Sequence, residues 1–234
     1  MQQFENGKIS NWIFDLDNTL YPAECNLFAQ IDQRMGDYIS RMLDVDLVEA
    51  RRVQKDYYYR FGTTLNGLMQ VHKLDPHDYL DFVHDIDHSV LPHSPLLREE
   101  IAKLEGRKFI FTNGSTRHGE QVAERLGLLD LFDGIFDIAA ADFTPKPNDQ
   151  AYERFLKRHD VAPEEAAMFE DLHPNLKVPH ARGMTTVLVN SSYEDHPAQK
   201  EKQGWAKLPD YVHFETDDLT GFLTDVNKLQ APKD

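Results

Sequence analysis

The sequence predicts an α/β fold, in which a parallel sheet with helices on both faces carries an inserted all-helical cap. Short apolar runs alternate with helical patterns over most of the chain, and this alternation is typical of a parallel sheet. Residues 21–105, between the first two apolar runs, hold several helical patterns and no convincing strand. We therefore expect a core of residues 1–20 and 106–234, and a cap of residues 21–105.

The expected strands are six apolar segments in the core. In chain order they are residues 12–14, 108–111, 134–140, 166–169, 185–189 and 211–214. The first contains three consecutive apolar residues, as in a strand buried on both faces. Polar residues follow each of the first four segments. Because ligands of open parallel sheets bind at the carboxyl ends of the strands, we expect these polar residues to converge there.

Helices are expected between these strands and throughout the cap. The core helices are predicted at residues 116–126, 149–159, 175–182 and 217–229, and the cap helices at 27–42, 47–61, 65–72, 76–86 and 96–104. Gly127 and Gly183 each follow a predicted helix, as is typical of helix C-termini. Pro22 and residues 91–95 are the expected hinges of the cap, and the last cap helix leads back to the sheet.

Composition and charge limit the class of protein. The 234 residues include 40 acids and 25 Lys or Arg, which gives a formal charge of −15. This charge repels nucleic acids and anionic membranes, so neither is an expected partner. A polar N-terminus and the lack of a long apolar run predict a cytoplasmic protein. The single cysteine excludes an intramolecular disulfide, and the oligomeric state stays open.

Two carboxylates follow the first predicted strand. Asp15 and Asp17 are two residues apart, so on an extended chain they share a face. They repel each other unless a cation, a proton or a substrate compensates their charge. On their own, they are also consistent with a strand that ends in an acidic loop.

Four motifs together resemble the haloacid dehalogenase-like hydrolase superfamily. They are Asp15-x-Asp17-x-Thr19, Thr112-Asn113, Lys146 before Pro147, and Glu170-Asp171-x-x-x-Asn175. All four occur in the order of the family, which is much more specific than any single motif. The resemblance implies a Rossmann-like core.

The resemblance also implies catalytic roles for Asp15 and Asp17. Asp15 would accept a phosphoryl group as an aspartyl phosphate. Asp17 would protonate the leaving alcohol and then activate water to hydrolyse this intermediate. A halide leaving group needs no acid, so Asp17 favours a phosphomonoesterase over a dehalogenase, although phosphomutases carry the same aspartate.

The remaining motif residues are the binding groups that the resemblance implies. Thr112, Asn113 and Lys146 would contact the phosphoryl group; alone, Lys146 between two prolines also fits a surface turn. Mg²⁺, a hard cation that prefers oxygen ligands, would be held by an Asp15 carboxylate oxygen, the Asp17 backbone carbonyl and Asp171. The sequence leaves the role of Glu170 open.

Three segments, residues 17–22, 58–68 and 82–85, resemble the pyrimidine 5′-nucleotidase branch of this superfamily. This implies a pyrimidine nucleoside monophosphate as the substrate and a cap that closes over it. A phosphatase for another small phosphate, such as a sugar phosphate, and a non-catalytic scaffold are the alternatives. The base preference and the cap residues that contact the substrate stay open.

Other cap residues allow two interpretations each. His84 and His88, spaced i, i+4, suit either a metal pair or the solvated face of a helix. Gly62 and Thr63 suit either a ligand-binding turn or a helix end followed by a helix start. Residues 57–59 are three tyrosines, which favour the cap core and its interface over a base-stacking platform.

Overall fold

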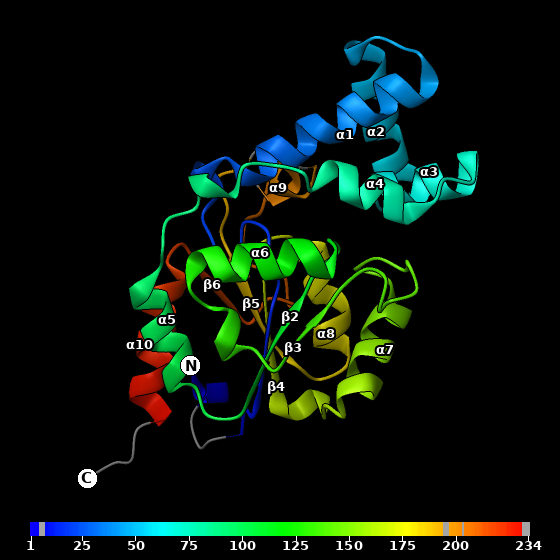
Figure 1. Cartoon of the computed structure of the whole chain (residues 1–234). Coiled ribbons are helices and arrows are strands. Elements are labelled where there is room, and N and C mark those ends of the chain that lie inside the picture. The colour runs from blue at the N-terminus through cyan, green and yellow to red at the C-terminus, as the bar shows by residue number, and fades with distance from the viewer. Residues whose placement is uncertain (5–7, 194–196, 203, 231–234) are drawn as a thin grey trace.

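The computed structural model describes residues 1–4, 8–193, 197–202 and 204–230, and its centre is a six-stranded sheet (Figure 1). The strand order is β3-β2-β1-β4-β5-β6, and every neighbouring pair is parallel. The strands are β1 Asn11–Phe14, β2 Arg107–Phe111, β3 Gly134–Phe136, β4 Ala166–Glu170, β5 Thr185–Val189 and β6 Phe214–Thr216. The predicted parallel α/β fold is confirmed, and β1 lies in the middle of the sheet.

Two apolar clusters cover the two faces of the sheet. The first joins Trp12 and Phe14 to α5 (Pro95–Lys103), α6 (Thr116–Leu126) and α10 (Leu219–Gln230). The second joins Ile13 to α7 (Asp149–His159) and to α8 (Lys177–Ala181). In Figure 1, α5 and α10 lie on one side of the sheet and α7 and α8 on the other. Because both faces are covered, β1 is apolar at consecutive positions.

Four helices form a third cluster beside the sheet: α1 (Leu27–Leu43), α2 (Leu47–Phe61), α3 (Thr64–His72) and α4 (Pro76–Val83). Figure 1 shows them as a separate layer, which we call the cap helices. Helix α9 (Pro197–Lys202) follows β5 in the chain. Leu27 and the α5 residues Leu97 and Ile101 pack into the first sheet cluster instead. The expected cap of residues 21–105 stays a prediction, and α5 contributes to the core.

Two predicted strands differ from the observed ones. Strand β3 ends at Phe136 instead of continuing to residue 140, because the Asp137 side chain forms hydrogen bonds at the start of helix α6. The Asp137 carboxylate accepts hydrogen bonds from the Thr116 backbone N–H at 2.8 Å and from the Ala140 backbone N–H at 2.7 Å. At residues 211–214 only Phe214 is in β6, since the Thr186 N–H donates to the His213 ring at 3.1 Å rather than to a strand.

Short 3₁₀ turns connect several of these elements. They are Gln2–Phe4, Ala23–Cys25, His88–Val90, Leu129–Leu131, Pro163–Glu165 and His173–Leu176. Within the described residues, no helix is long and apolar enough to cross a membrane.

Candidate active site

Asp15 lies at the carboxyl end of the central strand. Its backbone N–H donates to the Phe169 carbonyl oxygen at 2.9 Å, which continues the ladder between β1 and β4 one residue beyond β1. Its side chain is nearly buried, and Thr19 Oγ1 donates to Asp15 Oδ2 at 3.2 Å. The central position of β1 therefore brings this carboxylate close to the ends of β2 and β4, as the sequence predicted.

Lys146 meets Asp15 inside the protein. Lys146 Nζ donates to Asp15 Oδ1 and Glu170 Oε1, both at 2.7 Å, and to the Phe111 carbonyl oxygen at 2.8 Å. Lys146 is only 2% exposed, so the interpretation as a surface turn is wrong. Burial alone would lower its pKa, but Asp15 and Glu170 outweigh burial and raise it. The two carboxylates therefore favour the charged form of the lysine within this site.

Asn113 holds the backbone of Lys146 in place. Asn113 Oδ1 accepts from the Lys146 N–H at 2.9 Å, and Asn113 Nδ2 donates to the Lys146 carbonyl oxygen at 3.3 Å. Thr112 precedes it, nearly fully buried, and its Oγ1 accepts from the Gly114 N–H at 2.9 Å. The second and third motifs are thus joined directly by hydrogen bonds, although 33 residues separate them.

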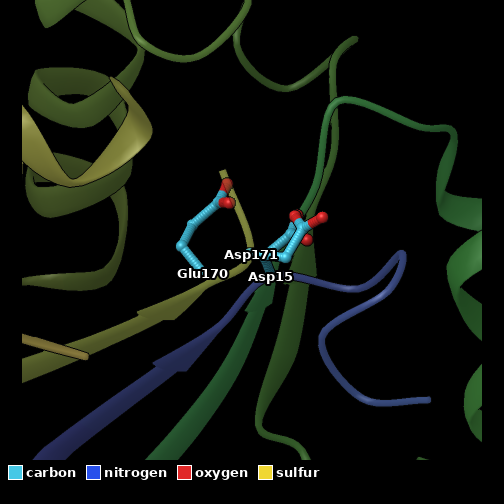
Figure 2. A group of neighbouring side chains, drawn as sticks. All are labelled: Asp15, Glu170 and Asp171. Carbon is cyan, nitrogen blue, oxygen red and sulfur yellow. The ribbon is translucent and has the colours of Figure 1, made fainter. Parts of the chain in front are cut away.

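Three carboxylates, those of Asp15, Glu170 and Asp171, lie at the ends of β1 and β4 (Figure 2). Oxygen atoms of Asp15, Glu170 and Asp171 all lie within 4.8 Å of one another, and all three residues are buried. Burial, followed by the charge of Glu170, raises the pKa of Asp15 to about 7. Burial and the charges of Glu170 and Asp15 raise the pKa of Asp171 well above its usual value. The cluster therefore holds protons unless a further cation compensates it.

This donor set fits Mg²⁺. All the side-chain ligands are carboxylate oxygens, which hard cations prefer. Three carboxylates face a single lysine charge at the cluster, so a divalent cation would relieve the repulsion that raises the pKa of Asp15 and Asp171. Among the residues that the structure describes, no comparable group includes His84 or His88.

Glu170, whose role the sequence left open, holds the lysine and the loop after β4. Besides Lys146, its Oε1 accepts from Asn175 Nδ2 at 2.6 Å, and its Oε2 accepts from the Leu172 N–H at 2.8 Å. Tyr152 OH in turn donates to the Asn175 carbonyl oxygen at 2.6 Å. Through these contacts Glu170 orients Lys146 and the loop after β4.

Asp17 has a different set of neighbours from Asp15. Its Oδ1 lies 2.5 Å from Tyr21 OH, which donates to it, and 2.9 Å from His118 Nε2. Burial would raise the pKa of Asp17, but His118 and these hydrogen bonds outweigh burial and lower it. Neither Tyr21 nor His118 was predicted as a site residue, because neither belongs to the four motifs. Tyr21 lies in the segment 17–22 that resembles the nucleotidase branch, and His118 lies in the first turn of the helix after the second motif.

A cavity of about 410 Å³ connects this site to the cap helices. Asp15, Asp17 and Lys146 line its sheet end, and the cap end includes apolar and aromatic side chains such as Phe28 and Tyr58. This volume lies within the usual range for small-molecule sites, about 300–1,000 Å³. The site is therefore open to a ligand that contacts both the sheet and the cap.

Tyr57, Gly62 and Thr63 have structural roles within the cap helices. Tyr57 packs in the cap core, whereas Tyr59 is 69% exposed. Gly62 ends α2 with a φ of 84°, and Thr63 Oγ1 accepts from the Asn66 N–H at 3.1 Å. The interpretation as a helix end followed by a helix start is thus confirmed, although both residues also line the cavity.

His84 does not share a helix with His88, and it does not lie on a solvated helix face. Helix α4 ends at Val83, so the predicted helix 76–86 is too long and His84 is its C-terminal cap. His84 is 9% exposed and stacks on His118, with ring centroids 4.4 Å apart. The helical spacing was misleading because the chain turns at this point into the segment that returns to the core.

The comparison with protein families names the class of protein that has this parallel sheet and this carboxylate–lysine site. The family model of haloacid dehalogenase-like hydrolases matches residues 11–178. The chain belongs to the haloacid dehalogenase-like hydrolase family.

The individual proteins that resemble this chain are less than 30% identical to it. The chain is 28% identical over 231 residues to Phosphate metabolism protein 8 of Saccharomyces cerevisiae, and the match covers 87% of this chain and 70% of that protein. A HAD phosphatase from Thermococcus onnurineus has a similar structure (TM-score 0.58, 20% identity), with 94% of this chain and 97% of that chain covered. So has an L-2-haloacid dehalogenase from Xanthobacter autotrophicus (TM-score 0.57, 17% identity), with 94% and 99% covered. At these identities the two structures show the fold alone.

Proposed function

We propose that this protein is a Mg²⁺-dependent phosphomonoesterase that acts through an aspartyl phosphate on Asp15. The observation that carries the proposal is the contact of Lys146 Nζ with Asp15 Oδ1 at 2.7 Å, beside the carboxylate of Asp171 and open to the cavity. A buried lysine on the reacting carboxylate supplies positive charge where phosphoryl oxygens would lie.

The reaction has two steps. A carboxylate oxygen of Asp15 attacks phosphorus, the bond between phosphorus and the leaving oxygen breaks, and Asp17, which acts in its protonated form although His118 lowers its pKa, gives that oxygen its proton. Asp17 then takes a proton from water, which attacks the aspartyl phosphate, releases inorganic phosphate and restores Asp15. Lys146, the Thr112 hydroxyl and the Asn113 backbone N–H bind the phosphoryl oxygens. Mg²⁺, held by Asp15, Asp171 and the Asp17 carbonyl, would offset the charge of the phosphoryl group.

The substrate we propose is a pyrimidine nucleoside monophosphate. In support, the cap segments resemble the pyrimidine 5′-nucleotidase branch, and the cavity is lined by carboxylates and Lys146 at one end and by Phe28, Met35 and Tyr58 at the other. Such a lining suits a phosphate joined to a flat, less polar group. The similarity to a protein named for phosphate metabolism also favours a phosphate ester.

Asp17 argues against a dehalogenase. Its carboxylate lines the cavity beside Asp15, and an acid at this position helps an alkoxide to leave, whereas a halide needs no proton. A sugar phosphate is the alternative substrate, and a scaffold without catalysis is the alternative function. The exclusion of nucleic-acid and membrane partners and the cytoplasmic location stay predictions from composition, and the oligomeric state stays open.

The experiment is phosphate release from UMP, CMP, AMP, GMP and several sugar phosphates, with Mg²⁺ and with excess EDTA. Preferred turnover of UMP and CMP that EDTA abolishes is the expected result. Turnover of sugar phosphates alone would keep the mechanism and replace the substrate. Chloride release from 2-chloropropionate without phosphate release from any ester would overturn the proposal.

A matched pair of variants separates catalysis from folding. Asp15→Asn should abolish phosphate release while the circular dichroism spectrum stays that of the wild type. Asp210→Asn removes a carboxylate whose side chain is 92% exposed, and should keep full activity. Full activity of Asp15→Asn would contradict its role as the nucleophile.

A further inference from the structure

His118 is fully buried, and its ring contacts Asp17 although 101 residues separate the two in sequence. His118 lies in the first turn of α6. The 2.9 Å distance from Nε2 to Asp17 Oδ1 is that of a hydrogen bond to a carboxylate, for which the ring carries its proton on Nε2. Tyr21 OH donates to the same oxygen at 2.5 Å. Both described donors therefore converge on one oxygen of Asp17.

The other carboxylate oxygen of Asp17, Oδ2, is therefore the one that a ligand in the cavity can reach. Asp17 lines the cavity beside Asp15, and no residue that the structure describes donates a hydrogen bond to its Oδ2. A carboxylate fixed through Oδ1 cannot rotate freely about its χ2 torsion, so Oδ2 keeps one direction. Proton transfer requires the acid within about 2.6–3.2 Å of the leaving oxygen, so this direction controls the step.

Residues at the end of the cap helices fix the ring of His118. His84, the C-terminal cap of α4, stacks on it with planes only 5° apart. His84 Nδ1 lies 3.0 Å from Ser115 Oγ. The same Ser115 oxygen accepts a hydrogen bond from the backbone N–H of His118 at 3.3 Å. His88 Nε2 lies 3.5 Å from His118 Nδ1. The ring that holds Asp17 is thus itself held by the segment that connects the cap helices to the core.

We propose that His118 is a positioning residue that holds Asp17 Oδ1 so that Oδ2 faces the leaving oxygen, and that His84 acts on Asp17 through His118. The assignment rests on the proposed phosphomonoesterase function. It adds to that function a residue outside all four motifs, and it links the position of the cap helices to the acid. A histidine that merely fills space in the core would have no such effect on a single chemical step.

The test compares two substrates that differ in how much they need an acid. The leaving alkoxide of a nucleoside monophosphate or another alkyl phosphate needs protonation, whereas the p-nitrophenolate of p-nitrophenyl phosphate leaves with little help. Both form the same aspartyl phosphate, so its hydrolysis is common to both. The value of kcat/KM reports only the steps up to formation of this intermediate, so it separates the departure of the leaving group from the later hydrolysis.

Three variants complete the experiment. His118→Leu removes the donor at similar volume and should lower kcat/KM at least about 10-fold more for the alkyl phosphate than for p-nitrophenyl phosphate, since general acids contribute about 10²–10⁴-fold. His118→Gln retains an N–H donor and should restore most of the difference. His159→Leu, a control on α7 where the ring packs on Phe109, should leave the ratio of the two kcat/KM values unchanged.

Each outcome decides the assignment. An equal loss on both substrates, or no loss, in a folded His118→Leu variant overturns it. If His118→Leu does not fold, His84→Phe keeps a stacked ring but loses the contact with Ser115, and it should show the same selective loss to a smaller extent. A His84→Phe variant without a selective loss then overturns the assignment. Wild-type protein that releases phosphate from neither substrate overturns the proposed function, and the role of His118 with it.

Discussion

Replacing Lys146 by methionine tests whether the buried lysine allows two carboxylates to lie together inside the protein. The lysine Nζ is 2.7 Å from an oxygen of Asp15 and 2.7 Å from an oxygen of Glu170, and its side chain is 1% exposed. Methionine is flexible, apolar and of similar length, so it fills the space without the charge. The change removes three hydrogen bonds and leaves the carboxylates without their cation.

The structure sets the size of the effect. Removing one partner of a buried ion pair costs about 3–5 kcal/mol. For a chain of this length, each kcal/mol lowers Tm by about 2–4 °C, so we expect a fall of about 6–20 °C at pH 7.5. The loss should shrink toward pH 5, because protonated carboxylates no longer repel each other. Adding Glu170→Gln to Lys146→Met removes one of the uncompensated charges and should recover part of the loss.

The assay is thermal unfolding of the metal-free protein in EDTA between pH 5 and pH 8. Lys228→Met is the matched control, since this side chain is 70% exposed and pairs with Asp225 at 2.9 Å. A surface change of this kind stays within about 0.5 kcal/mol. If Lys146→Met lowers Tm no more than Lys228→Met does at pH 7.5, the lysine does not compensate the carboxylates and our reasoning is refuted.

The remaining predictions concern the metal and the packing of the cap helices. Burial raises the pKa of Asp15 to about 7, so between about pH 4 and 7 the folded state binds a proton that the unfolded state lacks. This contribution to stability is lost as pH rises through 7. Because Mg²⁺ can replace the proton, the gain in Tm on adding Mg²⁺ should grow from pH 5 to pH 8. A gain that does not depend on pH, or a gain in Asp15→Asn as large as in the wild type, would contradict this. Gly67→Ala should destabilise by about 1–3 kcal/mol, because its Cβ would lie 2.5 Å from Tyr57 Cβ. Gly36→Ala is the control: its Cβ meets no atom closer than 3.9 Å, so it should be neutral or stabilising by up to about 1 kcal/mol. Urea unfolding measures both variants. Equal losses of stability would show that the contact with Tyr57 is unimportant.

Local patterns were sufficient for the fold and for the residues at the sheet edge. The apolar run at residues 12–14 predicted the central strand β1, and the alternation of runs and helices predicted the parallel sheet. Parallel strands share one carboxyl edge, so polar residues after β1 and β4 had to meet there. The structure brings Asp15, Lys146 and Asp171 together accordingly.

Short-range patterns failed where a side chain changes the course of the backbone. The run 134–140 is apolar enough for a strand, but the carboxylate of Asp137 accepts hydrogen bonds at the start of α6 and ends β3 at Phe136. The spacing of His84 and His88 fits a helix, yet α4 ends before His84. The end of β3 depends on a contact with Thr116, which is distant in sequence and which hydrophobic periodicity does not record.

By itself, the sequence determined the class of fold, the family motifs and which carboxylates lie at the edge of the sheet, because burial periodicity and strand direction are local properties of the chain. Only the tertiary structure decided that Glu170 holds Lys146 and that His118 holds Asp17. Those contacts depend on how helix α6 and the loops are placed on the sheet. Packing of the whole molecule fixes that placement, and no spacing within one segment encodes it.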